Sequence, residues 1–252
     1  TYTAEGITAI ADALRVNGGL TSIDLSNNQL CGVWTDYRGQ HGTYTAEGIT
    51  AIADAMRVNG GLTSIDLSGN QLCGIWTDDD GDQQGTYTAE GITAIADALR
   101  VNGALTSINL RGNELGDKGW GAIFAAICGS KDSKIMSLDA SCENISPAGV
   151  QLIAEALRTS VTGALTRVDV RHNNIAGDGA VQLAAAVLGN FKIEIFNEIP
   201  IKEMRANSIT ELDLNGKDFG VEGVMVVAGL IPVMGALTSV WTSAHDSLSS
   251  QY

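Results

Sequence analysis

The chain of 252 residues is poor in proline and in positive charge. It has 3 prolines, and its 15 lysines and arginines are outnumbered by 29 aspartates and glutamates, which gives a formal net charge of −14. A surface of this charge repels phosphate backbones, so nucleic acid and anionic membranes are not expected partners. No apolar run is long enough to cross a bilayer, because the strongest candidate, residues 224–237, is short and contains Pro232.

Residue patterns that usually carry catalysis or bind metals are also scarce. The three histidines fall in a long loop, a repeat turn and the terminal segment. The sequence contains no nucleophile elbow, no phosphate-binding loop with its lysine and no histidine pair at metal-ligand spacing. The acidic segment WTDDDGDQQG superficially resembles a calcium loop, but its glycine falls at the fourth instead of the sixth position of such a loop, and no glutamate follows at the twelfth. We therefore expect no enzymatic activity, no cofactor and no metal site.

What the sequence does contain is an internal repeat. The segment TYTAEGITAIADALRVNGGLTSIDLSNNQLCG opens the chain at Thr1 and returns nearly unchanged at Thr43, and its first half returns again at Thr86. Apolar residues first recur at helical spacing, as in ITAIADAL, and then alternate as in a strand, as in LTSIDL. Each copy therefore predicts one helix followed by one short strand.

Similar strand motifs continue along the chain and predict a single solenoid over residues 1–252. We expect about eight units, one of which is irregular and contains the segment FKIEIFNEIPI. The units are anchored near residues 20, 62, 105, 135, 165, 193, 209 and 237. Residues 242–252 have no apolar period, and we expect them to form a frayed tail.

The pattern L-x-x-L-x-L-x-x-N-x-L, which occurs as LTSIDLSNNQL, LTSIDLSGNQL and LTSINLRGNEL, resembles the leucine-rich repeat. The helical half and the later spacing near 28 to 30 residues are similar to the ribonuclease-inhibitor-like class. This resemblance covers almost the whole chain and implies a right-handed α/β solenoid, a horseshoe arc with parallel strands on its concave face and helices on its convex face. The residue pattern agrees, because each unit has an apolar side that only a neighbouring unit can bury.

The resemblance also assigns a structural role to the asparagine of the motif. In the family this side chain is buried at the turn after the strand, where it satisfies backbone groups of its own and neighbouring units. We expect an asparagine ladder formed by Asn28, Asn70, Asn113 and Asn173. Glu143, Lys217 and His245 occupy the corresponding position in weaker copies, where we expect less regular turns.

Two of the four cysteines occupy equivalent places in adjacent repeats, and none forms a C-x-x-C pair. Neighbouring strands lie about 5 Å apart, so Cys31 and Cys73 are compatible with a disulfide. The alternative is a stack of two half-buried free thiols, because free cysteine is commonly buried.

Residues between the buried leucines point away from the core, since side chains alternate along a strand. We call the resulting exposed row on the concave face the central column. It comprises Asp24, Asp66, Asn109, Asp139, Asp169, Asp213 and Trp241. Neighbouring carboxylates about 5 Å apart in water repel by about 0.8 kcal/mol, which a basic partner would relieve. Three flanking arginines, Arg111, Arg167 and Arg171, either contact a partner or pair with adjacent aspartates.

Two long connections, residues 31–42 and 73–85, lengthen the first two units. Insertions in repeat proteins emerge on one side and often form a binding surface. Each carries a tryptophan, Trp34 or Trp76, which either covers its own repeat or contacts a partner.

These features predict a non-catalytic protein–protein interaction scaffold whose partner is another protein, with the central column, the arginines and the two tryptophans as contact candidates. An accessory subunit of a larger assembly is one such role. The alternative is an activator of a small GTPase, which the resemblance to the ribonuclease-inhibitor-like class implies for some of its members. The chain shows no secretory signal. Because an ordinary repeat begins at Thr1, we expect the true N-terminus to lie further upstream, and no compartment is predicted.

Overall fold

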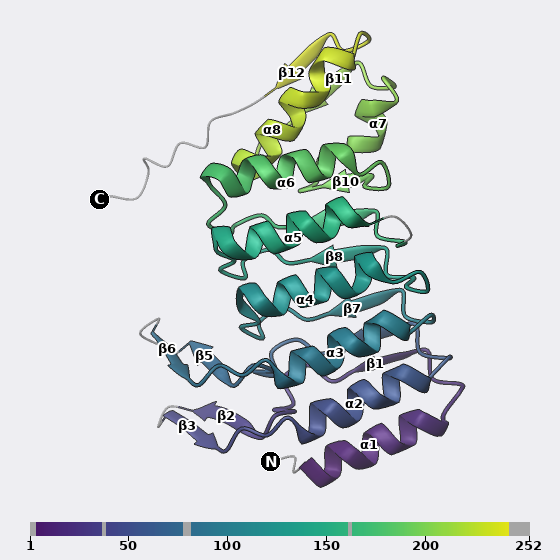
Figure 1. Cartoon of the computed structure of the whole chain (residues 1–252), viewed down its shortest axis with the longest axis vertical. Coiled ribbons are helices and arrows are strands. Elements are labelled where there is room, and N and C mark those ends of the chain that lie inside the picture. Colours follow the sequence, from purple (N-terminus) through teal and green to yellow (C-terminus); the bar gives the residue numbers. More distant parts are fainter. Residues whose placement is uncertain (1–3, 37–38, 78–81, 161–162, 242–252) are drawn as a thin grey trace.

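The computed structural model describes residues 4–36, 39–77, 82–160 and 163–241. Helices α1 to α6 lie one above another in chain order, from the N-terminal end of the stack towards the C-terminal end (Figure 1). The predicted tail, residues 242–252, lies outside the described part of the chain. The predicted solenoid is confirmed as an α/β stack in which each helix leads into a short strand.

The helices are α1 (Ala4–Val16), α2 (Glu47–Val58), α3 (Glu90–Val101), α4 (Gly116–Gly129), α5 (Pro147–Thr159), α6 (Gly177–Gly189), α7 (Ile201–Arg205) and α8 (Gly220–Leu230), with a 3₁₀ turn η1 (Ile231–Val233). The repeat strands are β1 (Ser22–Asp24), β4 (Ser64–Asp66), β7 (Ser107–Asn109), β8 (Ser137–Asp139), β9 (Arg167–Asp169), β10 (Ile195–Phe196), β11 (Glu211–Asp213) and β12 (Ser239–Trp241). We call α1 with β1 unit 1, α2 with β4 unit 2, α3 with β7 unit 3 and α4 with β8 unit 4.

The repeat strands pair in parallel, in the register that the sequence repeats require. They form three ladders, β1-β4-β7, β8-β9-β10 and β11-β12. In the first ladder Ile23 pairs with Ile65 and Ile65 pairs with Ile108. Equivalent residues of successive units therefore lie side by side, which lines up the central column within each ladder.

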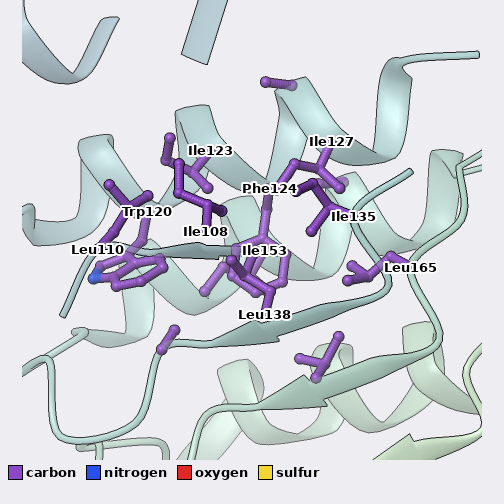
Figure 2. Packing of buried hydrophobic residues seen from close by; sticks show 14 of the residues in the cluster. Ile108, Leu110, Trp120, Ile123, Phe124, Ile127, Ile135, Leu138, Ile153 and Leu165 are labelled. Atoms are coloured by element: carbon purple, nitrogen blue, oxygen red, sulfur yellow. The ribbon is translucent and has the colours of Figure 1, made fainter. Parts of the chain in front are cut away.

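The core fills the space between the helices and the strands. In the middle of the stack, side chains of α4 and α5 meet the leucine and isoleucine side chains of the strand segments (Figure 2). Trp120 and Phe124 of α4 are fully buried, and their rings lie 6.4 Å apart in a tilted arrangement. The apolar side chains form one continuous cluster from Ile7 to Met234, so stacking buries the side that one unit leaves open.

The motif asparagines connect adjacent units at the end of the strand. Asn70 is fully buried, and its Nδ2 donates to the carbonyl oxygens of Leu25 and Leu67, at 2.9 Å each. Its Oδ1 accepts from the backbone N–H groups of Asn28 and Leu30 in unit 1. Asn113 repeats the contact one unit later by accepting from the backbone N–H of Asn70 at 2.8 Å.

Glu143 takes the asparagine position in unit 4 and satisfies different groups. Its Oε1 accepts from the backbone N–H of Gly112 at 3.0 Å, and its Oε2 accepts from the indole N–H of Trp120 at 3.4 Å. Burial raises the pKa of this carboxyl, although the two hydrogen bonds act in the opposite direction. The ladder resumes with Asn173, which accepts from the backbone N–H groups of Glu143 and Ile145.

A second set of asparagines connects the units at the opposite end of the strand, just after each helix. Asn59 donates to the carbonyl oxygens of Leu14 and Asn17 in unit 1 and accepts from the N–H groups of its own loop. Asn102 makes the same contacts one unit later. Both asparagines are buried, so each helix end is fixed to the preceding one.

Replacing Asn70 by alanine should therefore lower the free energy of unfolding by about 2–4 kcal/mol, because it leaves buried backbone groups of two units without partners. The matched control is Asn28→Ala in unit 1, where the half-buried side chain donates to Ser26 and to no other described residue. That change should cost less than about 1 kcal/mol. Denaturant unfolding of both variants measures the difference, and equal losses would contradict the ladder's role.

A buried carboxyl lies in the C-terminal part of the stack. Glu222 in α8 is 2% exposed, and its Oε1 accepts from Nδ2 of Asn197 at 2.9 Å. Its Oε2 has no hydrogen-bond partner among the described residues. Burial raises the pKa of Glu222, since the charged form is poorly solvated there.

Because the pKa of Glu222 is higher in the folded chain than in the unfolded chain, the stability it contributes is present at low pH and is lost as the pH rises through the folded value. Glu222→Gln keeps an acceptor for Asn197 and removes the charge. We expect the variant to melt about 2–4 °C above the wild type at pH 7.5, and the difference to disappear near pH 4. Thermal melts across this pH range test the expectation, and a pH-independent difference would contradict it.

Candidate interaction surface

The central column is built on the concave strands, and each polar member also closes the turn that follows it. Oδ1 of Asp24 accepts from the backbone N–H of Ser26 at 2.8 Å. The same contact, from a column residue to the N–H two residues later, recurs at Asp66, Asn109, Asp139, Asp169 and Asp213. The column therefore has a structural function in every one of these units, which the sequence analysis did not anticipate.

The carboxylates of the column differ in their exposure to solvent and in their hydrogen-bond partners. Asp24, Asp139 and Asp213 are exposed, whereas Asp66 and Asp169 are half-buried. Burial alone would raise the pKa of Asp66, but hydrogen bonds from Ser68 and Asn109 outweigh it and hold the pKa below its usual range. Asp66 is therefore ionised at neutral pH and already has partners on both oxygens.

Two of the three candidate arginines pair with aspartates of the column. Nη1 of Arg111 lies 3.3 Å from Asp139, between two exposed side chains. Arg171 donates through two nitrogens to Asp169 and through Nη2 to Glu198, at 2.8 Å. Arg167 is exposed, and no ion pair joins it to another residue in the described part of the chain. Arg167 is therefore the flanking arginine with its charge available.

Trp241 completes the column at the last described residue. Its strand β12 pairs with β11, so that Trp241 stands beside Asp213. The side chain is 44% exposed, next to an exposed Val240. The structure thus places an aromatic and an acidic residue side by side on this part of the concave face.

The two long connections form antiparallel hairpins, β2 (Val33–Asp36) with β3 (Gly39–Gly42) and β5 (Ile75–Thr77) with β6 (Gln83–Gly85). Both project from the same side of the stack, near the N-terminal ends of α2 and α3 (Figure 1). The hairpins are anchored by tyrosines, because Tyr44 donates to the carbonyl oxygen of Leu72 and Tyr87 to that of Leu115.

The two tryptophans lie in the first strand of each hairpin. The backbone of Trp34 pairs with His41, and its side chain lies outside the described part of the structure. Trp76 is half-buried, and its ring lies so close to Gly85 that a Cβ atom there would come within 2.7 Å of it. The Trp76 ring thus packs against the opposite strand of its own hairpin. Contact of either tryptophan with a partner stays a prediction.

The sequence comparison with protein families agrees with this geometry. The family described as Leucine Rich repeat matches residues 104–124 and 165–184, which cover β7 and β9 and the chain around them. The fold is that of a leucine-rich-repeat solenoid. No curated protein sequence matches it significantly.

Solved structures that resemble this chain do so at low identity. LegL7, a leucine-rich repeat-containing protein from Legionella pneumophila, is 19% identical over 94% of this chain and 68% of its own, with a TM-score of 0.47. The tropomodulin C-terminal domain of Caenorhabditis elegans is 11% identical over 74% and 93% of the two chains, with a TM-score of 0.46. The leiomodin-1 actin-binding site 2 is 14% identical over 78% and 79%, with a TM-score of 0.40.

The cysteines of this solenoid are free thiols, so the disulfide that strand spacing allowed between Cys31 and Cys73 is not formed. Both thiols are fully buried, and each is engaged with a tyrosine hydroxyl, Cys31 with Tyr44 and Cys73 with Tyr87. Burial raises the pKa of each thiol to about 12. Cys142, by contrast, is exposed at the turn after β8.

We expect one of the four thiols to react quickly with an alkylating reagent at pH 8. The thiolate is the reactive form, and a pKa of about 12 leaves about one part in ten thousand ionised. Cys128 is protected in the same way, since burial raises its pKa to about 11. Mass spectrometry should find Cys142 modified first in the folded protein and all four modified in denaturant. Rapid modification of Cys31 or Cys73 would contradict this burial.

A shallow hollow of about 350 Å³ lies beside the asparagine turns of units 2 to 4. Arg111, Glu114, Cys142 and Glu143 line it. Sequence reasoning missed this hollow because its lining comes from turns that lie 31 to 43 residues apart in the chain.

In the described part of the chain no helix has the length and apolarity that a bilayer span requires.

Proposed function

We propose that this protein is a non-catalytic scaffold that binds another protein through its concave face. The central column carries this proposal. Turn closure needs one oxygen from each column residue, and the amide of Asn109 supplies it as well as a carboxylate does. The negative charge at Asp24, Asp139 and Asp213 is therefore not required by the turn, and it faces solvent.

The chemistry of this face favours a partner with basic side chains. Asp24 and Asp213 are exposed, and among the described residues neither has an ion pair. A partner's lysines or arginines would relieve repulsion along the column, while Trp241 offers the kind of aromatic anchor that is enriched in protein interfaces.

Aspartate-to-asparagine substitutions separate charge from structure. The triple variant Asp24→Asn, Asp139→Asn and Asp213→Asn keeps an oxygen for each turn, so its melting temperature should stay within about 2 °C of the wild type. We expect a partner recovered from native extract by the wild type to be lost, or reduced at least about tenfold, with this variant.

The matched control neutralises the same number of aspartates on the convex helices, as Asp12→Asn, Asp54→Asn and Asp97→Asn. These residues form exposed ion pairs with Arg15, Arg57 and Arg100. The control should retain the partner, because exposed ion pairs contribute little to stability and lie away from the concave face. Equal retention by both triple variants, or equal loss, would contradict binding through the column.

A narrower form of this proposal is that the protein is an accessory subunit of a larger assembly. It predicts that the protein migrates well above its monomer mass of 26.3 kDa in gently prepared extract. Activation of a small GTPase is the alternative, and no residue of the concave face is tied to it in particular. A turnover assay with purified GTPases would test it directly.

A further inference from the structure

The stack has an internal step between units 3 and 4. Strand β7 ends the first ladder and β8 begins the second, although α3 and α4 pack against each other. A hairpin follows β1 and another follows β4, whereas β7 leads directly into α4. Hairpin β5–β6 therefore stands at the step, with the turn before α4 next to it.

A hollow of about 390 Å³ lies at this step, and we call it the step hollow. One part of its lining comes from the hairpin and its anchor, and includes Ile75 and Tyr87. The other part comes from the turns before α4 and α5, and includes Glu114, Glu143 and Asn144. These last three residues also line the hollow of about 350 Å³ beside the asparagine turns, so the two hollows adjoin.

The charge at the step differs from that of the regular turns. In unit 2 the turn carries two neutral amides, Asn70 followed by Gln71. At the step, Glu114 stands in the place of Gln71, and Glu143 stands in the place of Asn70. An amide is sufficient to connect one turn with the preceding unit, so the stacking of units does not require these two carboxylates.

Glu143 is a buried carboxylate that forms no ion pair with any described residue. It is 9% exposed, and its two oxygens accept from the N–H groups of Gly112 and Trp120. Burial raises its pKa, and of the nearby charges Arg111 lowers the pKa while Glu114 raises it. Arg111 lines the other hollow. Because a buried charge is costly unless it is paired, a cation in the step hollow would stabilise this carboxylate.

The hairpin supplies an apolar side opposite the carboxylates. Ile75 is buried, whereas Tyr87 is 37% exposed, and the hydrogen bond of its hydroxyl described above holds the ring in place. Asp117 also lines the hollow, but its two oxygens accept from the N–H and the hydroxyl of Ser146. With the exposed Lys118 as its one lysine or arginine, the lining carries net negative charge.

We propose that the step hollow binds an arginine side chain presented by a protein partner. The guanidinium group pairs with Glu114 and Glu143, and the aliphatic stem lies against Tyr87 and Ile75. Arginine fits better than lysine, because its planar fork of donors suits carboxylates and stacks on an aromatic ring. The inference rests on the proposed function only in taking the arginine from a protein partner.

The probe for this site is acetyl-arginine amide, added to the full chain and followed by two-dimensional NMR. The indole N–H of Trp120 reports on the site because it donates to Oε2 of Glu143. We expect its signal to shift and to saturate with acetyl-arginine amide, and to stay in place with acetyl-citrulline amide, which has the same shape without the charge. No saturable shift, an equal shift with citrulline, or tighter binding of acetyl-lysine amide would overturn the proposal.

Two substitutions locate the bound probe. Glu143→Gln and Glu114→Gln each remove one carboxylate, and each should weaken binding at least about tenfold, as expected for one hydrogen bond between charged groups. Glu114→Gln, at a half-buried position, keeps the test decisive if Glu143→Gln destabilises the fold. The matched control is Glu155→Gln on α5, where the exposed side chain pairs with Arg158. The control should bind as the wild type does, and equal binding by all three variants, or equal loss, would contradict the site.

The same measurement separates this proposal from binding through the central column. The triple variant Asp24→Asn, Asp139→Asn and Asp213→Asn leaves the step hollow intact, so it should bind acetyl-arginine amide as tightly as the wild type. If the probe does not bind while that variant loses its protein partner, the step hollow alone is wrong. If the probe binds as expected while that variant keeps its partner, the proposed function of the column alone is wrong.

Discussion

The stacking of this protein depends on hydrogen bonds that a side-chain amide of one unit makes with the backbone of the unit before it. Asn70 and Asn113 do so at the end of the strand, and Asn59 and Asn102 at its beginning. Each repeat strand is only three residues long in these units, too short to fix its own register. With both ends attached, the register is determined, and equivalent side chains of successive units fall into rows. The central column is a consequence of this constraint.

The same constraint makes the column serve two purposes. A residue that follows the buried strand position must turn the chain, and an aspartate or asparagine does so through its Oδ1. Because Asn109 turns the chain without a charge, the carboxylates at the other positions add repulsion that the fold does not need. Arg111 and Arg171 offset part of it in the middle of the arc. At the N-terminal end no described cation faces Asp24, and the charge there is left for a partner to balance.

The repeated sequence was sufficient to predict the alternation of helix and strand and the rows of outward side chains, since both follow from apolar spacing. The parallel ladder and its concave face were implied by the resemblance to the leucine-rich repeat. It did not reveal the second set of asparagines, although VNG occurs three times. An asparagine before glycine after a helix is typical of a local turn, so the sequence suggests no long-range contact. In the structure the side-chain amide also donates to a backbone carbonyl of the preceding unit, more than 40 residues away. The hairpins were predicted only as long connections, because segments such as GQHG and QQG have no strand pattern. The disulfide considered between Cys31 and Cys73 is absent for a related reason. The spacing of strands gives the distance between backbones, whereas each thiol contacts a tyrosine hydroxyl of the following segment.

Charge is distributed differently on the convex and the concave sides of the stack. On the convex side of units 1 to 3, aspartates and arginines alternate from helix to helix, since Arg15 pairs with Asp12 and Asp54, and Arg57 with Asp54 and Asp97. Each exposed pair contributes little to stability, but together they balance the convex surface. The excess negative charge of these units lies at two other places. One is the first turn of each helix, where the helix dipole stabilises a carboxylate, and the other is the central column. Further along, Arg111 and Arg171 pair with the column, and Arg167 beside it has no ion pair with any described residue. The central column therefore carries carboxylates without a described ion pair towards both ends, at Asp24 and Asp213, and mixed charge in the middle.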